Sequence, residues 1–331
     1  MSRIAIIGAG SWGTALAISL ARRGGHDLTL WAHRTDHAEE IRLHGENRTY
    51  LAGYPVPADI RLTASLDQAI NNAEILLCVT PSQALRSIMQ QIGPLLTPDQ
   101  VLLSASKGIE EKSFLRMSQV MQQYAPKNPI GTLGGPSFAQ EVAAAMPTAI
   151  TIATHEEALG KSLQDAFTST SLRVYRNEDV PGTELGGALK NVIALAAGVV
   201  TGLELGNNAA AALITRGMVE ITRLAIACGG RAETMSGLSG IGDLVLTCTG
   251  GLSRNRAVGV ELGKGRKLPE ILAGLHGKVA EGVRSTTAAL GLAHRHGVEM
   301  PITEQMAAVL HEDKSPLDAI RDLMTRPGRT E

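Results

Sequence analysis

Short runs of β-branched and aliphatic residues alternate with stretches of helical spacing along the first half of the chain. The strand-like runs cover residues 3–7, 27–31, 74–79, 101–105, 130–133 and 149–152. This alternation predicts an α/β domain with a parallel sheet and helices on both of its faces. The runs at 75–79 and 101–103 are apolar without alternation, which is typical of strands covered on both sides. We therefore expect a doubly wound sheet in which Cys78 is a core residue.

The pattern changes near residue 180. Residues 177–182 are polar and turn-forming, and from Thr183 onward Ala-rich and Leu-rich helical patterns replace the strand-like runs. We predict an all-α second domain, with residues 1–180 in the first domain and 181–331 in the second. The most apolar stretch, 192–203, is shorter than the roughly 20 residues that a membrane helix needs, so we expect a buried helix.

Composition narrows the classes of function. The 31 basic and 32 acidic residues nearly cancel, so no global field favours nucleic acid or an anionic membrane. Three cysteines without close paired spacing argue against both a disulfide framework and a zinc site. The first residues enter a strand directly, without the features of a signal peptide. We expect a cytoplasmic protein with no nucleic-acid partner, no integral membrane segment and no bound metal.

A glycine-rich segment, Gly8-Ala9-Gly10-Ser11-Trp12-Gly13, follows the first strand-like run and opens a helical run over 14–22. In that context Gly8 permits a tight turn, Gly10 lets a pyrophosphate approach the backbone, and Gly13 lets helix and strand pack closely. A glycine-rich turn without a ligand is the alternative, and the position after the first strand disfavours it. We predict a Rossmann-like dinucleotide site.

The second strand-like run ends in Trp31-Ala32-His33-Arg34, about 20 residues beyond the glycines. An NAD-specific enzyme often carries an acidic residue there for the ribose 2′-hydroxyl. Arg34, helped by His33, suits a 2′-phosphate instead, so NADP is the preferred cofactor and NAD a possible second one. The alternative for Arg34 is an ordinary exposed arginine.

Two segments of the first domain are candidates for binding an anionic substrate. Lys107 follows the strand-like run 101–105, at the carboxyl edge where open parallel sheets bind ligands. Gly134-Gly135-Pro136-Ser137 follows another run, and Pro136 is placed to begin a helix whose free amides attract anions. A solvated loop lysine and a simple helix cap at Ser137 are the respective alternatives.

The second domain offers a cation, a carboxylate and a polar row. Lys190 lies at the edge of an otherwise apolar helix, where a charge requires a partner or a substrate. Asp243 in Gly-Ile-Gly-Asp-Leu is a candidate carboxylate. The row Ser253-Arg254-Asn255-Arg256 can bind a phosphate, although a solvated turn is an equal alternative for this segment alone.

Together these segments resemble the bacterial-type NAD(P)-dependent glycerol-3-phosphate dehydrogenase family over nearly the whole chain. The motifs that carry the resemblance are Gly8-Ala9-Gly10-Ser11-Trp12-Gly13-Thr14-Ala15, Ser106-Lys107-Gly108, Gly134-Gly135-Pro136-Ser137-Phe138-Ala139, Leu189-Lys190-Asn191, Gly240-Ile241-Gly242-Asp243-Leu244 and Ser253-Arg254-Asn255. The resemblance implies reduction of dihydroxyacetone phosphate for glycerophospholipid synthesis, by a homodimer that binds this small phosphate ester.

The resemblance also implies residue roles. The implied cofactor contacts are Ser11, Trp12, His33, Arg34, Tyr50, Lys107, Ala139, Arg254, Val279 and Glu281. The implied substrate contacts are Lys107, Gly135, Ser137, Lys190, Asp243, Ser253, Arg254 and Asn255, with Lys190 as the catalytic acid or base. Tyr50, Val279 and Glu281 rest on the resemblance only.

Lys190, as the ammonium, is expected to protonate the carbonyl oxygen of the substrate while the nicotinamide delivers hydride to the carbon. Two rival functions remain at this point. A β-hydroxyacid dehydrogenase shares the architecture and a Lys-Asn pair, and differs in accepting a carboxylate. A redox sensor that binds NADP(H) without chemistry has no need for Lys190 with Asp243.

Overall fold

The computed structural model describes residues 1–274 and 280–328, which form two compact units. The first unit comprises Met1–Lys107 and Leu115–Glu184, and the second comprises Gly108–Phe114 and Leu185–Glu331. The units separate four residues beyond the boundary expected from the sequence, inside helix α8 (Val180–Gly202). Glu184 keeps the first turn of α8 in the first unit, because its buried carboxylate accepts hydrogen bonds from the backbone N and the hydroxyl of Ser118 at 2.7 and 2.6 Å.

Phe114 anchors the segment Gly108–Phe114 in the second unit. The guanidinium of Arg295 lies 4.4 Å from the centre of the Phe114 ring and also donates to the carbonyl of Ser113 at 2.8 Å. A Cβ added at Gly291 would lie 2.1 Å from Cζ of Phe114. The ring therefore occupies space that a side chain at position 291 would fill.

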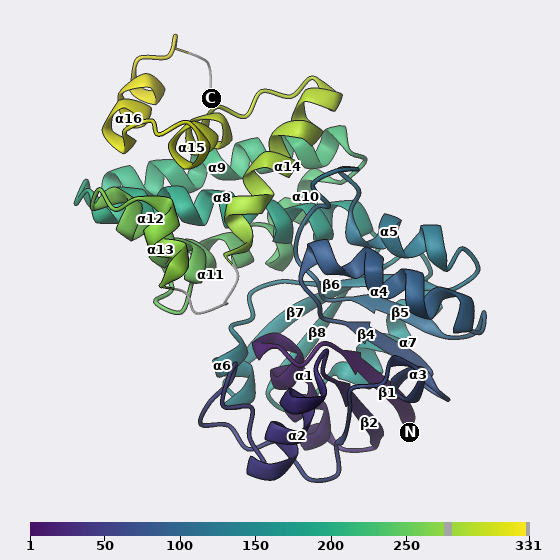
Figure 1. Cartoon of the computed structure of the whole chain (residues 1–331). Helices are drawn as coiled ribbons and strands as arrows, with labels where there is room; N and C mark the ends of the chain where they lie inside the picture. Colours follow the sequence, from purple (N-terminus) through teal and green to yellow (C-terminus); the bar gives the residue numbers. More distant parts are fainter. Residues whose placement is uncertain (275–279, 329–331) are drawn as a thin grey trace. The chain divides into compact units, whose positions relative to one another are not determined.

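One sheet of eight strands organises the first unit, in the order β3-β2-β1-β4-β5-β6-β7-β8. Figure 1 labels all of these strands except β3. The strands are β1 (Ser2–Ile7), β2 (His26–Trp31), β3 (Arg61–Thr63), β4 (Ile75–Cys78), β5 (Val101–Ser104), β6 (Ile130–Gly134), β7 (Thr148–Thr154) and β8 (Leu172–Asn177). Neighbours from β3 to β6 are parallel, with Ile4 of β1 level with Leu28 of β2 and Ile75 of β4. This arrangement confirms the predicted Rossmann-like domain.

The end of the sheet differs from the prediction, which expected parallel strands throughout and no strand at 172–177. β7 runs antiparallel to β6, and β8 is parallel to β7. A parallel pair needs a crossover of a dozen or more residues, usually helical, that returns the chain to the other end of the sheet. The link between β6 and β7 contains only the five-residue helix α6 (Ala139–Ala143), about 7.5 Å long, so the chain re-enters from the same edge.

Alternate strand residues supply the two hydrophobic cores of the first unit. Ile4 and Ile6 belong to one cluster, whereas Ala5 and Ile7 belong to another on the opposite face. The first cluster includes residues of α1, α2 and α7, and the second includes residues of α3, α4 and α5. The helices of this unit are α1 (Ser11–Arg23), α2 (Thr35–His44), α3 (Leu66–Ile70), η1 (Ser82–Ala84), α4 (Leu85–Ile92), η2 (Gly93–Leu95), α5 (Met117–Tyr124), α6 and α7 (Glu157–Phe167).

Every regular element with stated bounds among the described residues of the second unit is a helix, which confirms the predicted all-α domain. Besides α8 it contains α9 (Gly206–Ala227), α10 (Ala232–Met235), the π-helical turn η3 (Leu238–Gly242), α11 (Asp243–Thr249), α12 (Arg254–Gly263), α13 (Leu268–Ala273), α14 (Glu281–His296), α15 (Pro301–His311) and α16 (Pro316–Met324). Helix α8 is long and apolar enough to cross a membrane, yet 89% of its most apolar window is buried inside the protein. We interpret it as the central core helix.

Two pairs of glycines bring α8 and α12 into backbone contact. A Cβ added at Gly198 would lie 2.1 Å from the carbonyl O of Arg256, and one at Gly259 would lie 2.0 Å from the carbonyl O of Leu195. Gly202 and Gly263 repeat the arrangement one turn further along. This glycine seam leaves no space for a side chain, so it fixes the distance between the two helices.

Candidate active site

The dinucleotide loop joins β1 to α1, and glycine is required at both of its ends. Gly8 has φ of +130°, and a Cβ there would lie 2.6 Å from the carbonyl O of Val79. A Cβ at Gly13 would lie 1.9 Å from the carbonyl O of Gly8. The first glycine therefore makes the turn and the third allows helix and strand to approach, as the sequence predicts.

The amino end of α1 fits the pyrophosphate of a dinucleotide. Gly10 is the N-cap, and within the described part of the chain no side chain caps it and no atom lies within 4 Å of where its Cβ would be. Trp12 buries its indole Nε1 without a hydrogen-bond partner among the described residues. Unsatisfied backbone N–H groups at a helix amino end attract anions, so the loop has room and donors for a phosphate.

His33 and Arg34 follow β2 and precede α2. Arg34 is the N-cap of α2 and is two-thirds exposed, and its Nε lies 3.1 Å from Oδ1 of Asp36. The ring of His33 contacts Trp31 edge-on, with ring centres 5.8 Å apart. Arg34 thus has an accessible guanidinium, but an incoming phosphate would compete with Asp36 for it.

Tyr50, expected only from the resemblance, lies beside the dinucleotide loop. The hydroxyl of Ser11, the first residue of α1, donates to the carbonyl O of Tyr50 at 2.6 Å. The fully buried side chain of Asn47 contacts the same loop. Sequence reasoning missed Asn47, because no periodic pattern marks a polar loop residue whose contacts lie far along the chain.

Lys107, Gly135 and Ser137 come together at the carboxyl edge of the sheet. Nζ of Lys107 donates to the carbonyl O of Gly135 at 3.0 Å, and the hydroxyl of Ser137 donates to the same oxygen at 3.1 Å. Ser137 is not a helix cap, because the N-cap of α6 is Phe138. The expected helix start at Pro136 is wrong: Gly135 adopts φ of +103° and the chain turns before α6 begins at Ala139.

Ser106 precedes Lys107 and holds it in place. Ser106 was named in the sequence motif Ser106-Lys107-Gly108 but was assigned no role. Its hydroxyl donates to the carbonyl O of Thr80 at 2.6 Å, and the backbone N of Thr80 donates back to it at 3.1 Å. These bonds join the segments that follow β4 and β5. Thr80 also buries a hydroxyl with no partner among the described residues, close to Gly8.

In the second unit, Lys190 of α8 and Asp243 of α11 form a buried ion pair. Nζ of Lys190 donates a short hydrogen bond to Oδ1 of Asp243, and the side chains are 8% and 0% exposed. Asp243 begins α11 directly after the π-helical turn η3. A buried ammonium with a fixed carboxylate is suited to donating and accepting protons in a defined direction.

Asn255 joins three helices close to that pair. Its Nδ2 donates to Oδ1 of Asn191 at 2.9 Å, and its Oδ1 accepts from the backbone N of Gly282 in α14 at 3.0 Å. Asn255 therefore contacts the residue of α8 that directly follows Lys190 in the sequence. Asn191 was named in the sequence motif Leu189-Lys190-Asn191 but was assigned no role.

The row from Ser253 to Arg256 is the amino end of α12 and not a solvated turn. Ser253 is the N-cap, and its hydroxyl accepts from the backbone N of Arg256 at 3.2 Å. Desolvation by neighbouring protein atoms lowers the pKa of Arg254 below its usual value, while the charge of Glu281 at the start of α14 acts in the opposite direction. Arginine still remains cationic. Val279 lies outside the described residues.

Two of the three cysteines, Cys78 and Cys248, are buried. Burial raises the pKa of both Cys78 and Cys248 to about 12, and the charge of Lys190 only partly opposes this effect at Cys248. Both thiols stay protonated near neutral pH, so they act as core residues.

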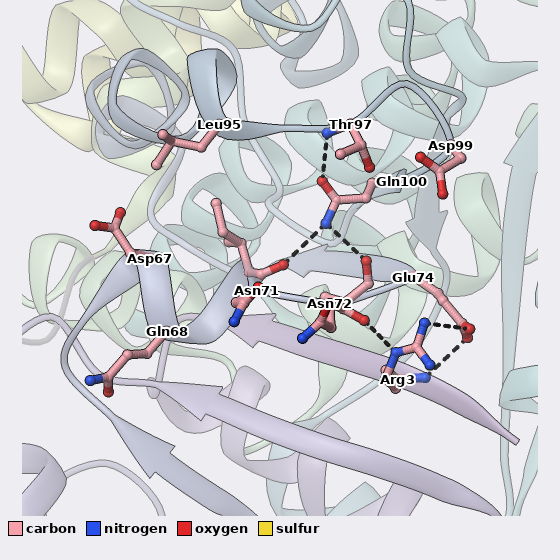
Figure 2. A pocket seen from close by; sticks show the side chains of 12 residues that line it. Arg3, Asp67, Gln68, Asn71, Asn72, Glu74, Leu95, Thr97, Asp99 and Gln100 are labelled. Carbon is pink, nitrogen blue, oxygen red and sulfur yellow. Dashed lines mark hydrogen bonds and ion pairs between the residues drawn. The ribbon is translucent and has the colours of Figure 1, made fainter.

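A shallow cavity of about 620 Å³ lies at the opposite end of the sheet, before β1, β4 and β5 (Figure 2). Several of its polar groups pair with one another: Arg3 pairs with Glu74 at 3.0 Å, and Nε2 of Gln100 donates to the carbonyls of Ile70 and Ala73 at 3.1 and 2.9 Å. Ligands of open parallel sheets bind beyond the carboxyl ends of the strands. We assign this cavity no part in the site.

Two family models together match most of the chain. Residues 3–160 match the N-terminal family described as NAD-dependent glycerol-3-phosphate dehydrogenase N-terminus, and residues 179–321 match the corresponding C-terminal family. The chain is 58% identical to the glycerol-3-phosphate dehydrogenase (NAD(P)+) of Acidobacterium capsulatum, over 100% of both chains. It is 56% identical to the same-named protein of Koribacter versatilis, over 100% of this chain and 99% of the relative.

Solved structures extend the likeness to the fold. The glycerol-3-phosphate dehydrogenase of Coxiella burnetii superposes with a TM-score of 0.94 at 40% identity, over 98% of this chain and 99% of that one. A ketopantoate reductase from Ralstonia eutropha shares the fold alone, with a TM-score of 0.62 at 16% identity over 96% and 99% of the chains. With both halves matched and more than half of its residues identical to full-length relatives, the chain belongs to the NAD-dependent glycerol-3-phosphate dehydrogenase family.

Proposed function

We propose that this protein is an NAD(P)-dependent sn-glycerol-3-phosphate dehydrogenase that reduces dihydroxyacetone phosphate. The buried Lys190–Asp243 pair carries the proposal, because it supplies a proton donor in a chain that also has a dinucleotide loop. Full-length relatives that bear this name support it. The product would feed the synthesis of glycerophospholipids.

In this proposal Lys190 is the acid. Its ammonium donates a hydrogen bond to the ketone oxygen and transfers a proton to that oxygen, while Asp243 orients Nζ and balances its charge. When bound, the nicotinamide supplies the hydride that the carbonyl carbon accepts. One proton and one hydride together convert the ketone to the secondary alcohol, and in the reverse direction Lys190 accepts the proton.

Residues at the amino end of α12 are suited to the phosphate ester. Ser253, Arg254 and Asn255 present a hydroxyl, a guanidinium and an amide, and Arg254 gives a charge-assisted hydrogen bond to a phosphate oxygen. We also assign Lys107, Gly135 and Ser137 to the substrate, supported by their shared position at the carboxyl edge of the sheet.

The cofactor assignment favours NADP, with NAD as an alternative. Gly8, Gly10, Ser11, Trp12 and Gly13 would hold the pyrophosphate, and the exposed Arg34 with His33 would bind the 2′-phosphate. Tyr50, Lys107, Ala139, Arg254, Val279 and Glu281 complete the proposed cofactor contacts.

Neither rival function has a specific observation in its favour. The likeness to ketopantoate reductase is confined to the fold, and a sensor without chemistry would not need a buried lysine and aspartate to remain paired.

The deciding experiment mixes the purified full-length protein with NADPH and dihydroxyacetone phosphate and follows the absorbance of the reduced nicotinamide. The same assay is run with NADH, with glyceraldehyde 3-phosphate and with a 2-keto acid. Oxidation that requires dihydroxyacetone phosphate is the expected result. Turnover of the keto acid with no turnover of dihydroxyacetone phosphate would contradict the proposal and favour a hydroxyacid dehydrogenase.

We further infer a cytoplasmic location and a homodimer. Cys78 and Cys248 are buried without forming a disulfide, which supports a reduced compartment, and the family resemblance supports the dimer. Light scattering on the purified chain would measure the assembly, and a monomer mass at micromolar concentration would contradict it.

A further inference from the structure

Every hydrogen-bonding group of the Asn47 side-chain amide has a partner within the first unit. Its Nδ2 donates to the carbonyl O of Ala9 at 2.9 Å and to the hydroxyl of Thr14 at 2.8 Å. Its Oδ1 accepts from the backbone N of Tyr50 at 3.2 Å and lies 3.1 Å from Nε2 of His37. An amide has two donors and two lone pairs, so all four are engaged. A carbonyl oxygen cannot donate, so Nε2 of His37 carries a hydrogen.

These four partners come from three segments that surround the proposed adenosine half of the cofactor. Ala9 lies within the dinucleotide loop and Thr14 in the first turns of α1. Tyr50 lies beside that loop, where Ser11 binds its carbonyl. His37 is in the first turn of α2, three residues after Arg34.

We propose that Asn47 is the positioning residue of the cofactor site: it holds the loop that faces the pyrophosphate, the segment of Tyr50 and the start of α2 in one fixed arrangement. The hydrogen bond to His37 extends this arrangement to the first turn of α2, which directly follows His33 and Arg34. Ordering these segments in advance lowers the entropy lost when the dinucleotide binds. The inference rests on the proposed function only in taking NADP(H) as the ligand.

Direct binding separates this inference from the proposed reaction. NADPH and NADH are titrated into full-length protein and followed by nucleotide fluorescence, without substrate. For Asn47→Ala we expect both Kd values to rise about tenfold, since losing hydrogen bonds worth roughly 1–2 kcal/mol in total corresponds to that factor. The kcat at saturating cofactor should stay within about twofold of the parent, because the bound state recovers the arrangement.

Asn128→Ala is the matched control. Nδ2 of Asn128 also donates to two carbonyls of the first unit, those of Thr97 and Gln100 at 2.7 and 2.9 Å, but at the amino ends of the strands. This variant should lose thermal stability and keep both Kd values. Equal Kd increases in the two variants would assign Asn47 to general stability and overturn the inference.

Two further variants keep the test decisive if Asn47→Ala does not fold. Thr14→Val is close in shape and removes one partner of Asn47, so both Kd values should rise several-fold. His37→Leu removes the hydrogen bond to α2 and should raise the Kd of NADPH more than that of NADH. Unchanged affinity in a folded Asn47→Ala or Thr14→Val protein would overturn the proposal, whether or not the parent reduces dihydroxyacetone phosphate.

Discussion

Lys190 and Asp243 hydrogen-bond to each other across two helices of the second unit, with the carboxylate fully buried. This pair predicts a loss of turnover when the amine is removed. Lys190→Ala should lower kcat by a factor on the order of 10³ or more, because the proton donor and its charge are lost together. Steady-state kinetics measure this loss, and titration with NADPH should show a Kd within about threefold of the parent. Loss of NADPH affinity as large as the loss of kcat would contradict the assignment. Lys161→Ala, at an exposed position of α7, is the control.

Arg254 predicts a different kinetic pattern. Arg254→Ala should raise the KM for dihydroxyacetone phosphate by about 10- to 100-fold, since a charge-assisted bond to phosphate is worth roughly 1.5–3 kcal/mol. The effect on kcat should be smaller. An unchanged KM would show that the phosphate binds elsewhere.

Arg34 predicts the cofactor preference. Arg34→Ala should raise the KM for NADPH about tenfold and leave that for NADH nearly unchanged, because only NADPH carries the 2′-phosphate. Asp36→Ala, which removes the present partner of the guanidinium, should change the NADPH value in the opposite direction. Equal effects of Arg34→Ala on the two cofactors would refute the 2′-phosphate role.

The glycine seam between α8 and α12 predicts that adding a single methyl group there destabilises the protein. Gly259→Ala should lower the free energy of unfolding by about 1–3 kcal/mol, because its Cβ would meet the backbone of α8. It should also lower kcat, since α12 carries Ser253 and Asn255 and α8 carries Lys190. Urea unfolding and kinetics measure the two effects. Gly251→Ala has open space at that position among the described residues and serves as control; similar losses in both would argue against the seam.

Glu220 predicts a pH dependence of stability. Its carboxyl accepts hydrogen bonds from Ile302 and Thr303 in the first turn of α15, yet burial raises its pKa from 4.5 to about 7. Between these values the unfolded chain releases the proton while the folded chain keeps it. The contribution to stability is therefore complete below about pH 4.5 and is lost as pH rises through about 7, by roughly 3 kcal/mol at most.

Thermal melting of Glu220→Gln between pH 4.5 and 8 tests this sign. The neutral amide should flatten the decline with pH, even if its midpoint is lower throughout. Glu233→Gln, at an exposed position of the same unit, should keep the slope of the parent. An identical slope in Glu220→Gln would show that the carboxyl titrates near its ordinary value.

The sequence predicted those features whose cause is local. The apolar runs of β1, β4 and β5 and the glycines at 8, 10 and 13 specify their own conformations. β3 was missed because Arg61–Thr63 is too short and polar to form a pattern. The direction of β7 depends on the connection before it, which strand propensity does not encode.

The same limit applies to the candidate site. Asn47 was missed because its partners Ala9 and Thr14 lie 38 and 33 residues away, and a polar loop carries no periodicity to announce such contacts. The pairing of Lys190 with Asp243 was expected from the proposed chemistry and not from any pattern in the sequence, because the two residues lie 53 positions apart. Their approach depends on how α8 packs against η3, where a Cβ at Gly186 would lie 2.3 Å from the carbonyl O of Ser239. The Gly-x-x-x-Gly spacings in α8 and α12 were a readable sign of close helix packing that sequence reasoning did not use.

The strand order places β8 at one edge of the sheet and the three-residue β3 at the other. An unpaired strand invites a second chain to add to it, with aggregation as the usual outcome. Here one border is too short to template such pairing, and the other exposes Arg173, Tyr175 and Arg176, with Arg173 stacked 5.1 Å from the ring of Tyr175. Both edges of the sheet therefore disfavour the addition of a strand from a second chain.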